Sequence, residues 1–239
     1  MKNNTYKFAG ITVNASYETD HLEKQCGDYV TKEAAELYIS VSEDDVERER
    51  KKADCEGYSY GYLESLAFYR KFCNAAVENN VLLFHSSAIA VDGKAYLFAA
   101  PSGTGKSTHT RLWRRAFGER AVTVNDDKPL LRISGNRIVA YGTPWDGKHR
   151  LSNNVSFDVA GICFIARGKE NGIKRLSQME ALPEFLSQTY RPDSEEGVGK
   201  MLELSLSITS NVPMYKLWCN ISDEAVRIAY EEMSGNKFD

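Results

Sequence analysis

The sequence Ala-Pro-Ser-Gly-Thr-Gly-Lys-Ser at residues 100–107 decides the fold of this chain. It matches the phosphate-loop (Walker A) pattern, with Ala100 in place of the first glycine. An apolar run at residues 95–99 comes directly before it, and a run with helical spacing begins at Lys106. A strand, a glycine-containing loop and a helix in that order are the context in which this pattern is specific. The stretch therefore predicts a phosphate loop between a strand and a helix of an α/β sheet.

Each position of the loop has a physical task in binding phosphate. Small residues allow successive backbone N–H groups to converge on phosphate oxygens, and the following helix directs its positive end at the same anion. Lys106 is expected to reach the terminal phosphates, and the Ser107 hydroxyl is expected to ligate Mg²⁺. The residues that we expect to bind the donor are Ser102, Gly103, Thr104, Gly105, Lys106, Ser107 and Thr108. The alternative interpretation is a glycine-rich turn without a ligand.

Two adjacent carboxylates, Asp126 and Asp127, end the next apolar run at residues 121–124. In an open α/β sheet the carboxyl ends of the strands face the ligand crevice. One carboxylate there can hold Mg²⁺ while the other accepts a proton from an attacking hydroxyl. We expect Asp126 to share the metal with Ser107 and Asp127 to be the base, with the division of roles left open. An Asp-Asp pair can also simply open a turn.

Two further groups of basic residues are candidates for the site. His85 follows the apolar run 81–84 and is either a structural histidine or a group close to the transferred phosphate. Lys148, His149 and Arg150 follow a glycine-bounded segment at residues 142–147, and are either a solvated loop or cations that clamp an anionic group. On the helix after the loop, His109 is ambiguous. Three arginines of that helix are expected to be solvated surface: Arg111, Arg114 and Arg115.

Composition narrows the class of protein. The 239 residues are 42% hydrophobic and 26% charged, which is ordinary for a globular protein with a sizeable core. A formal net charge of −3 lacks the basic footprint of a general nucleic-acid binder. No apolar run is long enough to span a bilayer, and the first residues carry no signal-peptide core. Five scattered cysteines without Cys-x-x-Cys spacing indicate reduced thiols, so we expect a cytoplasmic protein without membrane or nucleic-acid partners.

The chain is expected to comprise two parts. Residues 1–80 predict a small α+β element, with a strand pair or bulged strand around Gly10 and a helix over 59–78. Residues 81–239 predict the catalytic domain, with hairpin turns at 92–93 and 135–136, a buried strand at 159–166 and a late strand at 214–219. Helices are expected from a capping box at Ser177, over 195–210, and after Ser222. We expect the first part to pack on the second.

With these motifs assembled, the stretch from His85 to Asp127 resembles the catalytic core of the HPr kinase/phosphorylase and phosphoenolpyruvate carboxykinase superfamily. The segment His-Ser-Ser-Ala at 85–88 is similar to the histidine-bearing strand of the carboxykinases. The loop at 100–107 is similar to the nucleotide loop of both families, and Asn-Asp-Asp at 125–127 is similar to their acidic pair. The resemblance implies a nucleotide-dependent phosphotransferase that uses Mg²⁺ or Mn²⁺. It also implies an α/β (α+β) fold with a mixed β-sheet and flanking helices, like the HPr kinase C-terminal domain and the carboxykinase core.

By position, the resemblance implies that Lys106 and Ser107 bind phosphate and metal. It also implies that Asp126 and Asp127 divide metal binding and general-base catalysis between them, and that His85 lies near the transferred phosphate. Two differences from these families limit the resemblance. The glycine–isoleucine–asparagine segment of HPr kinases is missing after the acidic pair, and the first third of the chain does not resemble their N-terminal domain. HPr as substrate and oxaloacetate decarboxylation are therefore both disfavoured.

The sequence thus predicts an ATP-dependent kinase that acts on a hydroxyl, either a serine of a peptide or protein or a small metabolite such as free serine. Lys106, Lys148 and Arg150 would stabilise the phosphoryl group in flight. One alternative is a nucleotide-binding regulatory module without turnover. Another is a phosphorylase or hydrolase that acts on a phosphoprotein. The acceptor, the base specificity of the donor site and the oligomeric state are not encoded in these motifs.

Overall fold

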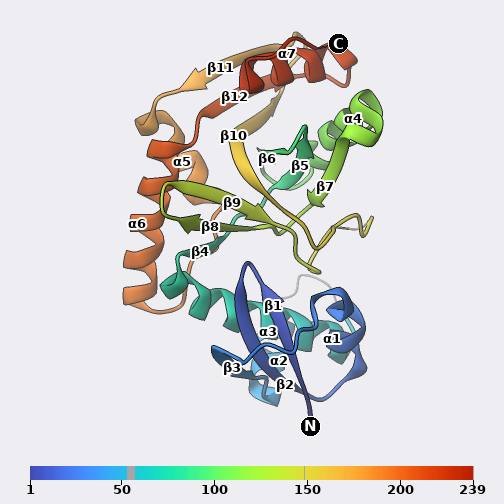
Figure 1. Cartoon of the computed structure of the whole chain (residues 1–239), viewed down its shortest axis with the longest axis vertical. Coiled ribbons are helices and arrows are strands. Elements are labelled where there is room, and N and C mark those ends of the chain that lie inside the picture. The colour runs from blue at the N-terminus through green and yellow to red at the C-terminus, as the bar shows by residue number, and fades with distance from the viewer. Residues whose placement is uncertain (53–56, 148, 239) are drawn as a thin grey trace. The chain divides into compact units, whose positions relative to one another are not determined.

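The structure is a computed structural model that describes residues 1–52, 57–147 and 149–238. The chain divides into two compact units, Met1–Asn79 and Asn80–Asp239 (Figure 1). Within the described residues, no helix has both the length and the apolar character that crossing a bilayer requires. Four cysteines lie in the described parts and none of them forms a disulfide: Cys26, Cys73, Cys163 and Cys219. The fifth, Cys55, lies outside the described residues.

The first unit is a small three-stranded sheet with helices. Two of its strands form a hairpin in which Ala9 and Gly10 make the turn with positive φ angles, and the third strand pairs parallel with the second. The ring of Phe8 packs against Phe68 and Phe72 of the long helix, which closes the core of the unit. The elements are β1 (Lys2–Phe8), β2 (Ile11–Tyr17), α1 (Asp20–Gln25), η1 (Gly27–Tyr29), β3 (Leu37–Ser40), α2 (Glu43–Lys52), α3 (Tyr60–Ala76) and η2 (Val77–Asn79).

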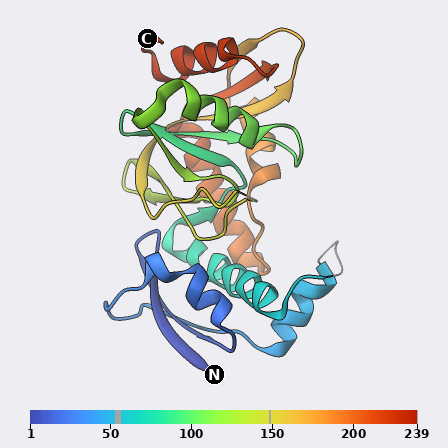
Figure 2. The same cartoon turned by 90° about the vertical axis from the view of Figure 1, so that its right-hand side faces the viewer.

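The second unit contains a curled mixed sheet and four α-helices in its described residues (Figure 2). Its strands are β4 (Val81–Leu83), β5 (Ser87–Val91), β6 (Lys94–Ala99), β7 (Ala121–Asn125), β8 (Leu130–Ser134), β9 (Arg137–Tyr141), β10 (Ser156–Arg167), β11 (Gly172–Leu176) and β12 (Met214–Cys219). Its helices are α4 (Lys106–Phe117), η3 (Gly118–Arg120), α5 (Gln178–Gln188), α6 (Glu195–Asn211) and α7 (Asp223–Ser234).

Strand β10 organises this sheet because it pairs with three neighbours. The strand order is β4-β8-β9-β10-β6-β5-β7, with β12 and then β11 attached to the second half of β10. The first residues of β10 pair antiparallel with β9, whereas β6 and β12 run parallel to it. The carboxyl ends of β6, β10 and β12 therefore lie side by side, and the loop after β6 begins at that edge.

An aromatic core holds α4 and α7 against one face of the sheet. The indole of Trp113 in α4 is fully buried and packs against Tyr96 and Phe98 of β6 and against Tyr230 of α7. On β12, Leu217 belongs to this core, whereas the neighbouring Lys216 forms an ion pair with Glu184 of α5. Because successive strand residues point to opposite faces, α5 covers the face opposite to α7.

Most sequence-predicted elements of the second unit are present. The structure confirms a strand that ends at Ala99, a helix that begins at Lys106, and hairpins at 92–93 and 135–136. Gly118 ends α4 with a positive φ angle, and the capping box at Ser177 has both of its hydrogen bonds. The sequence analysis did not predict α1 or β11. Strand β11 is exposed at Lys174 and Arg175 and gains its order from antiparallel pairing with β12.

Candidate functional site

The loop between β6 and α4 takes a backbone path that requires glycine. Gly103 and Gly105 have φ angles of 76° and 128°, in the region that L-residues with a side chain rarely adopt. The N–H of Thr104 donates to the carbonyl of Pro101 over 3.2 Å, which makes the loop a tight turn. Ser102 and Gly103 are exposed at its tip, while Ser107 and Thr108 are in the first turn of α4. A ligand above the loop meets the N-terminal, electropositive end of this helix.

Lys106 is folded back beneath the loop. Its Nζ atom donates to the carbonyl oxygen of Ala100 over 2.8 Å, and the residue is only 8% exposed. Burial lowers the pKa of the Lys106 ammonium, while the nearby negative charge of Asp127 opposes that shift. The predicted phosphate-binding lysine and the predicted base are therefore close enough for their charges to interact.

Arg167, the last residue of β10, also contacts the loop. Its guanidinium donates to the carbonyl of Gly103 over 2.6 Å and to the carbonyl of Thr104 over 3.4 Å. These bonds restrain the loop from the side of the adjacent parallel strand. The sequence analysis did not single out Arg167. An arginine that ends a buried strand is the signal that could have found it, because such strand ends face the crevice of an α/β sheet.

Asn125 holds the acidic pair in place at the end of β7. Its side chain is fully buried, and Oδ1 accepts from the N–H groups of Asp127 (2.8 Å) and Lys128 (2.6 Å). Its Nδ2 donates to the carbonyl and to the hydroxyl of Thr143, each over 3.0 Å. The chain therefore turns sharply after β7 and presents Asp126 and Asp127 in different directions.

His85 contacts Asp127. The Nε2 atom of His85 lies 3.0 Å from Oδ1 of Asp127, and Nζ of Lys128 lies 3.0 Å from Oδ2. Burial acts to raise the pKa of the Asp127 carboxyl, but the hydrogen bond to His85 and the charge of Lys128 outweigh it, so that the pKa is well below its ordinary value. Asp127 is therefore ionised at neutral pH and has an oriented neighbour on each oxygen.

Asp126 is buried with one oxygen unused. Its Oδ1 accepts from the N–H of Gly147 over 2.6 Å, whereas Oδ2 has no hydrogen-bond partner among the described residues. The residue is 4% exposed, and a Cβ atom on Gly147 would lie 2.8 Å from Oδ2. A buried carboxylate oxygen without a donor is unfavourable unless a cation or another ligand completes it.

A third carboxylate lies close to Asp126. The N–H of Ser152 donates to Oδ2 of Asp146 over 3.3 Å. Burial raises the pKa of the Asp146 carboxyl, and the nearby charge of Asp126 adds to that rise. The carboxylates of Asp126, after β7, and Asp146, after β9, carry like charges that repel each other. A cation between them would reduce this repulsion.

Ser107 and Asp126 line the same pocket, which has a volume of about 320 Å³. These are the two residues that the sequence analysis assigned to the metal. The other lining residues are Thr108, Thr110, Arg111, Arg114, Thr123, His149 and Leu151. Arg111 and Arg114, which we expected to be solvated surface, both border the pocket, and Arg111 is also exposed. Neither His85 nor Asp127 is among its lining residues.

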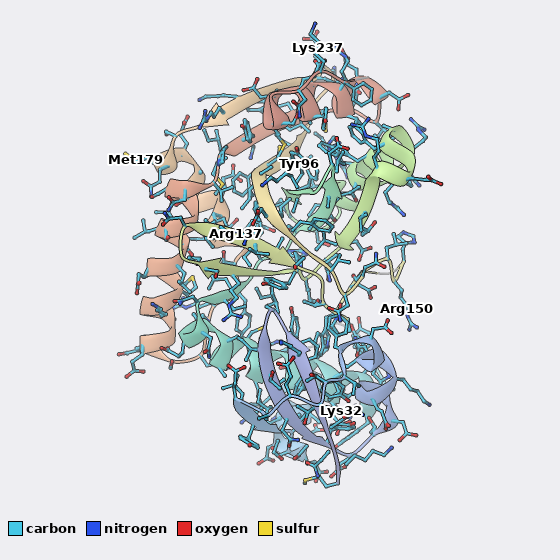
Figure 3. The ribbon with its side chains drawn as sticks, in the orientation of Figure 1. Lys32, Tyr96, Arg137, Arg150, Met179 and Lys237 are labelled. Carbon is cyan, nitrogen blue, oxygen red and sulfur yellow. The ribbon has the colours of Figure 1, made fainter. Side chains whose placement is uncertain are left out.

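The remaining sequence-predicted residues are placed as follows. Arg150 is exposed, has a positive φ angle and does not line the pocket; it is labelled in Figure 3. Lys148 lies outside the described residues. His109 is a core residue: its Nε2 accepts from Nε1 of Trp113 over 3.0 Å, and burial lowers its pKa to about 3.

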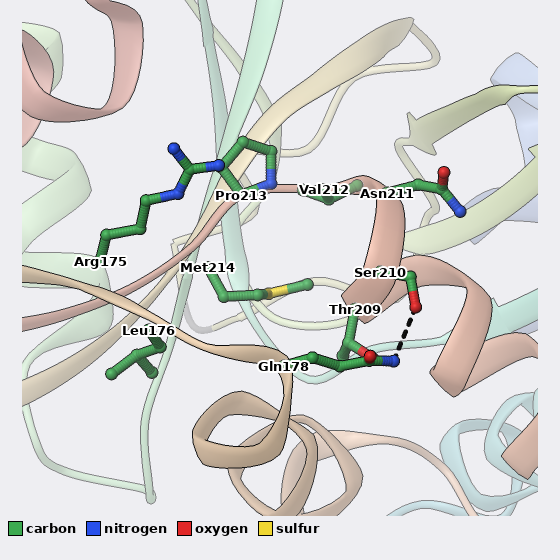
Figure 4. A pocket seen from close by; sticks show the side chains of 9 residues that line it. All are labelled: Arg175, Leu176, Gln178, Thr209, Ser210, Asn211, Val212, Pro213 and Met214. Atoms are coloured by element: carbon green, nitrogen blue, oxygen red, sulfur yellow. Dashed lines mark hydrogen bonds between the residues drawn. The ribbon is translucent and has the colours of Figure 1, made fainter.

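A second pocket of about 290 Å³ lies where the end of α6 meets the junction of β11 and α5 (Figure 4). Gln178 donates to Ser210 across it over 2.6 Å. The only charged side chain that lines it in the described residues is that of Arg175. It shares no residue with the pocket at Ser107 and holds no acid–base pair.

Within the described residues, no three His, Cys, Asp or Glu side chains form a cluster that could hold a metal by themselves. Mg²⁺ in phosphoryl-transfer sites is commonly held by one or two carboxylates together with the phosphates of the substrate and water. Ser107 and Asp126 supply donors of that kind, and the orphaned Oδ2 of Asp126 fits such an ion.

No protein-family model matches the chain, and neither does any curated protein. Among solved structures, the chain is similar to the Hpr(Ser) kinase/phosphatase from Coxiella burnetii. The sequence identity is 12% and the TM-score is 0.36, and the match covers 64% of this chain and 99% of that one. This is a distant similarity of fold, and the site stands on its own geometry.

Proposed function

We propose that this chain is an ATP-dependent kinase that transfers a phosphoryl group to a hydroxyl. The observation that carries the proposal is the shared pocket of Ser107 and Asp126, next to a glycine loop whose Lys106 is within reach of the charge of Asp127. Residues far apart in the sequence thus supply a phosphate-binding loop, a metal-binding pair and an ionised base. Phosphoryl transfer depends on positioning and electrostatic stabilisation, which this set can supply.

The donor phosphates would bind on the loop and on the N-terminus of α4. The backbone N–H groups from Ser102 to Thr108 and the ammonium of Lys106 would hold them. Lys106 would leave the carbonyl of Ala100 to reach the phosphates. Ser107 and Asp126 would hold Mg²⁺, which when bound neutralises charge on the phosphate oxygens. Arg167 would keep the loop in shape through its bonds to Gly103 and Thr104.

Asp127 would remove the proton from the acceptor hydroxyl. The hydroxyl oxygen then bonds to the γ-phosphorus, the bond from that phosphorus to the β–γ bridging oxygen breaks, and ADP leaves. His85 and Lys128 contact separate oxygens of Asp127 and fix the orientation of the carboxylate. A carboxylate whose pKa is low is a weak base in solution, but in phosphoryl transfer the proton is lost mainly as the new P–O bond forms.

The test is transfer of label from γ-labelled ATP in the presence of Mg²⁺. Wild type and Asp127→Asn would be offered a serine-containing peptide mixture, free serine, other hydroxyl metabolites and cell extract. Label on one acceptor with wild type alone supports the kinase. No label in any mixture, together with ATP binding by calorimetry, would overturn the kinase in favour of a nucleotide-binding regulatory module.

A further inference from the structure

The pocket beside the loop brings charges of both signs together. Asp126 and Ser107 line it with Arg111 and Arg114, which follow Ser107 by about one and about two turns of α4, so that the arginines lie farther from the loop along the helix. The two arginines are three residues apart on α4, so they lie on neighbouring positions of one helix face. Asp126 is the only acid among the described lining residues, while His149 adds a further basic side chain.

In the part of the chain that the structure describes, no ion pair joins Arg111 or Arg114 to an acid. Other arginines nearby are paired: Arg115 with Asp223, and Arg120 with Asp92 through two hydrogen bonds. The two unpaired guanidinium groups of α4 are therefore the ones that border the pocket. Guanidinium groups bind carboxylates and phosphates through paired, parallel hydrogen bonds.

The size and the walls of the pocket restrict what can occupy it. A volume of about 320 Å³ is at the lower end of the range for small-molecule sites. Its walls are completed by Thr108, Thr110, Thr123 and Leu151. At Ser107 and Asp126 it adjoins the residues proposed to hold the donor phosphates. A ligand with an anionic group on the arginines would thus extend its other end toward the reacting phosphoryl group.

We infer that Arg111 and Arg114 form the anion-binding subsite of the acceptor, and that the acceptor is a small hydroxyl compound that carries a carboxylate group. This inference rests on the proposed function and selects the small-metabolite acceptor over a protein serine. The anionic group of the acceptor contacts the two guanidinium groups, and its hydroxyl extends out of the pocket past Asp126 toward Asp127, which follows Asp126 in the chain but does not line the pocket. The phosphorylated product keeps the same anionic group on the same two residues.

Binding of product-like phosphate esters tests this inference without turnover. The probes are two matched pairs that differ by a carboxylate: O-phosphoserine with O-phosphoethanolamine, and 3-phosphoglycerate with glycerol 3-phosphate. Calorimetry would compare the full-length wild type, the double variant Arg111→Ala/Arg114→Ala, and Arg115→Ala as the matched control. The control removes an arginine of the same helix that is paired with Asp223.

Wild type and Arg115→Ala should bind the carboxylate member of at least one pair about tenfold more tightly or better, and the double variant should lose that preference. Arg111→Lys/Arg114→Lys should retain part of it, because the charge remains without the bidentate geometry. All three arginines lie on the surface side of α4, and circular dichroism would check that each variant is folded. A wild type without preference in either pair would overturn the inference.

A second arm identifies the source of the bound anion. Calorimetry with MgATP should give dissociation constants for the double variant and wild type within about threefold. Loss of MgATP affinity with an unchanged carboxylate preference would assign the arginines to the donor phosphates and overturn the acceptor subsite. The labelled-ATP assay tests the kinase proposal separately. If phosphoryl transfer occurs and substitution of Arg111 and Arg114 has no effect on it, the kinase proposal holds and the subsite proposal does not. If the wild type prefers the carboxylate probes but transfers no phosphoryl group, Arg111 and Arg114 bind an anion and the kinase proposal is overturned.

Discussion

The imidazole Nε2 of His85 lies 3.0 Å from Oδ1 of Asp127, although the two residues follow strands at opposite ends of the path from β4 to β7. The connection between β4 and β5 crosses to β7, and there the N–H of Ser86 donates to the carbonyl of Asp127 over 3.2 Å. Backbone pairing therefore sets the position of the histidine. Its ring restricts the orientation of the carboxylate proposed as the base.

Asp127→Asn should lower phosphoryl transfer by a factor of about a hundred or more and change the dissociation constant of MgATP by less than about threefold. An amide keeps the shape of the carboxylate but cannot accept the proton, and general-base catalysis contributes roughly 10²–10⁴ in rate. The measurement is the initial rate with labelled ATP. Asp158→Asn is the control, because Asp158 is an acid paired with Arg137 and Lys94 on other strands. Normal transfer by Asp127→Asn would mean that another group is the base.

Lys106→Ala should weaken MgATP binding about tenfold or more and lower turnover, because it removes the basic side chain that the loop itself carries. The same change should leave the melting temperature unchanged or raise it, since burial disfavours the charged form of Lys106 in the free protein. Calorimetry and thermal denaturation would measure the two effects. Lys94→Ala, on the exposed start of β6, is the control. Unchanged MgATP affinity in Lys106→Ala would remove the loop from the site.

Gly147→Ala should weaken the binding of Mg²⁺ and so raise the Mg²⁺ concentration that activity requires. The new Cβ would lie 2.8 Å from the unpartnered Oδ2 of Asp126 and would displace that carboxylate. The Mg²⁺ concentration for half-maximal activity should rise by about tenfold. Gly199→Ala is the matched control, because a Cβ at Gly199 meets nothing within 4 Å. An unchanged Mg²⁺ requirement in Gly147→Ala would show that Asp126 does not hold the metal.

The free energy of unfolding should decrease as the pH is lowered, because His109 is buried in its neutral form. Burial lowers its pKa from 6.5 to about 3, so the folded state keeps this imidazole neutral while the unfolded chain takes up a proton below pH 6.5. The contribution is complete above about pH 6.5 and is lost as the pH falls toward 3, at up to about 1.4 kcal/mol per pH unit.

Urea denaturation at several pH values would measure this dependence. His109→Gln, which retains an acceptor for the indole of Trp113, should show a weaker loss of unfolding free energy between pH 7 and pH 5. If the slopes of wild type and variant agreed, His109 would not be the group that titrates.

Local patterns in the sequence were sufficient for most of the second unit. The apolar run before the loop, the helix that starts at Lys106 and the two hairpin turns depend on neighbouring residues, so they could be predicted from spacing alone. Strand β11 could not, because its order comes from a partner that is distant in the sequence. The pairing of β10 with both β6 and β12 is likewise a property of the assembled sheet.

The candidate site divides in the same way. The loop motif and the acidic pair are contiguous in sequence and could be recognised there. The role of Arg167 could not, because it bonds to Gly103 of a distant loop. Asn125 depends in part on Thr143, which follows β9, and the place of Arg111 and Arg114 beside the pocket depends on how α4 packs against other elements. His109, which the sequence left ambiguous, is decided by the indole that its ring contacts.

The sequence by itself therefore determined which segments form the strand, the loop and the helix around residues 95–117, because glycine conformation and apolar spacing are local. Only the tertiary structure decided that Ser107 and Asp126 share one pocket, that His85 contacts Asp127, and that one oxygen of Asp126 has no partner among the described residues. These relations depend on the order of strands in the sheet and on burial, which are set by packing across the whole unit.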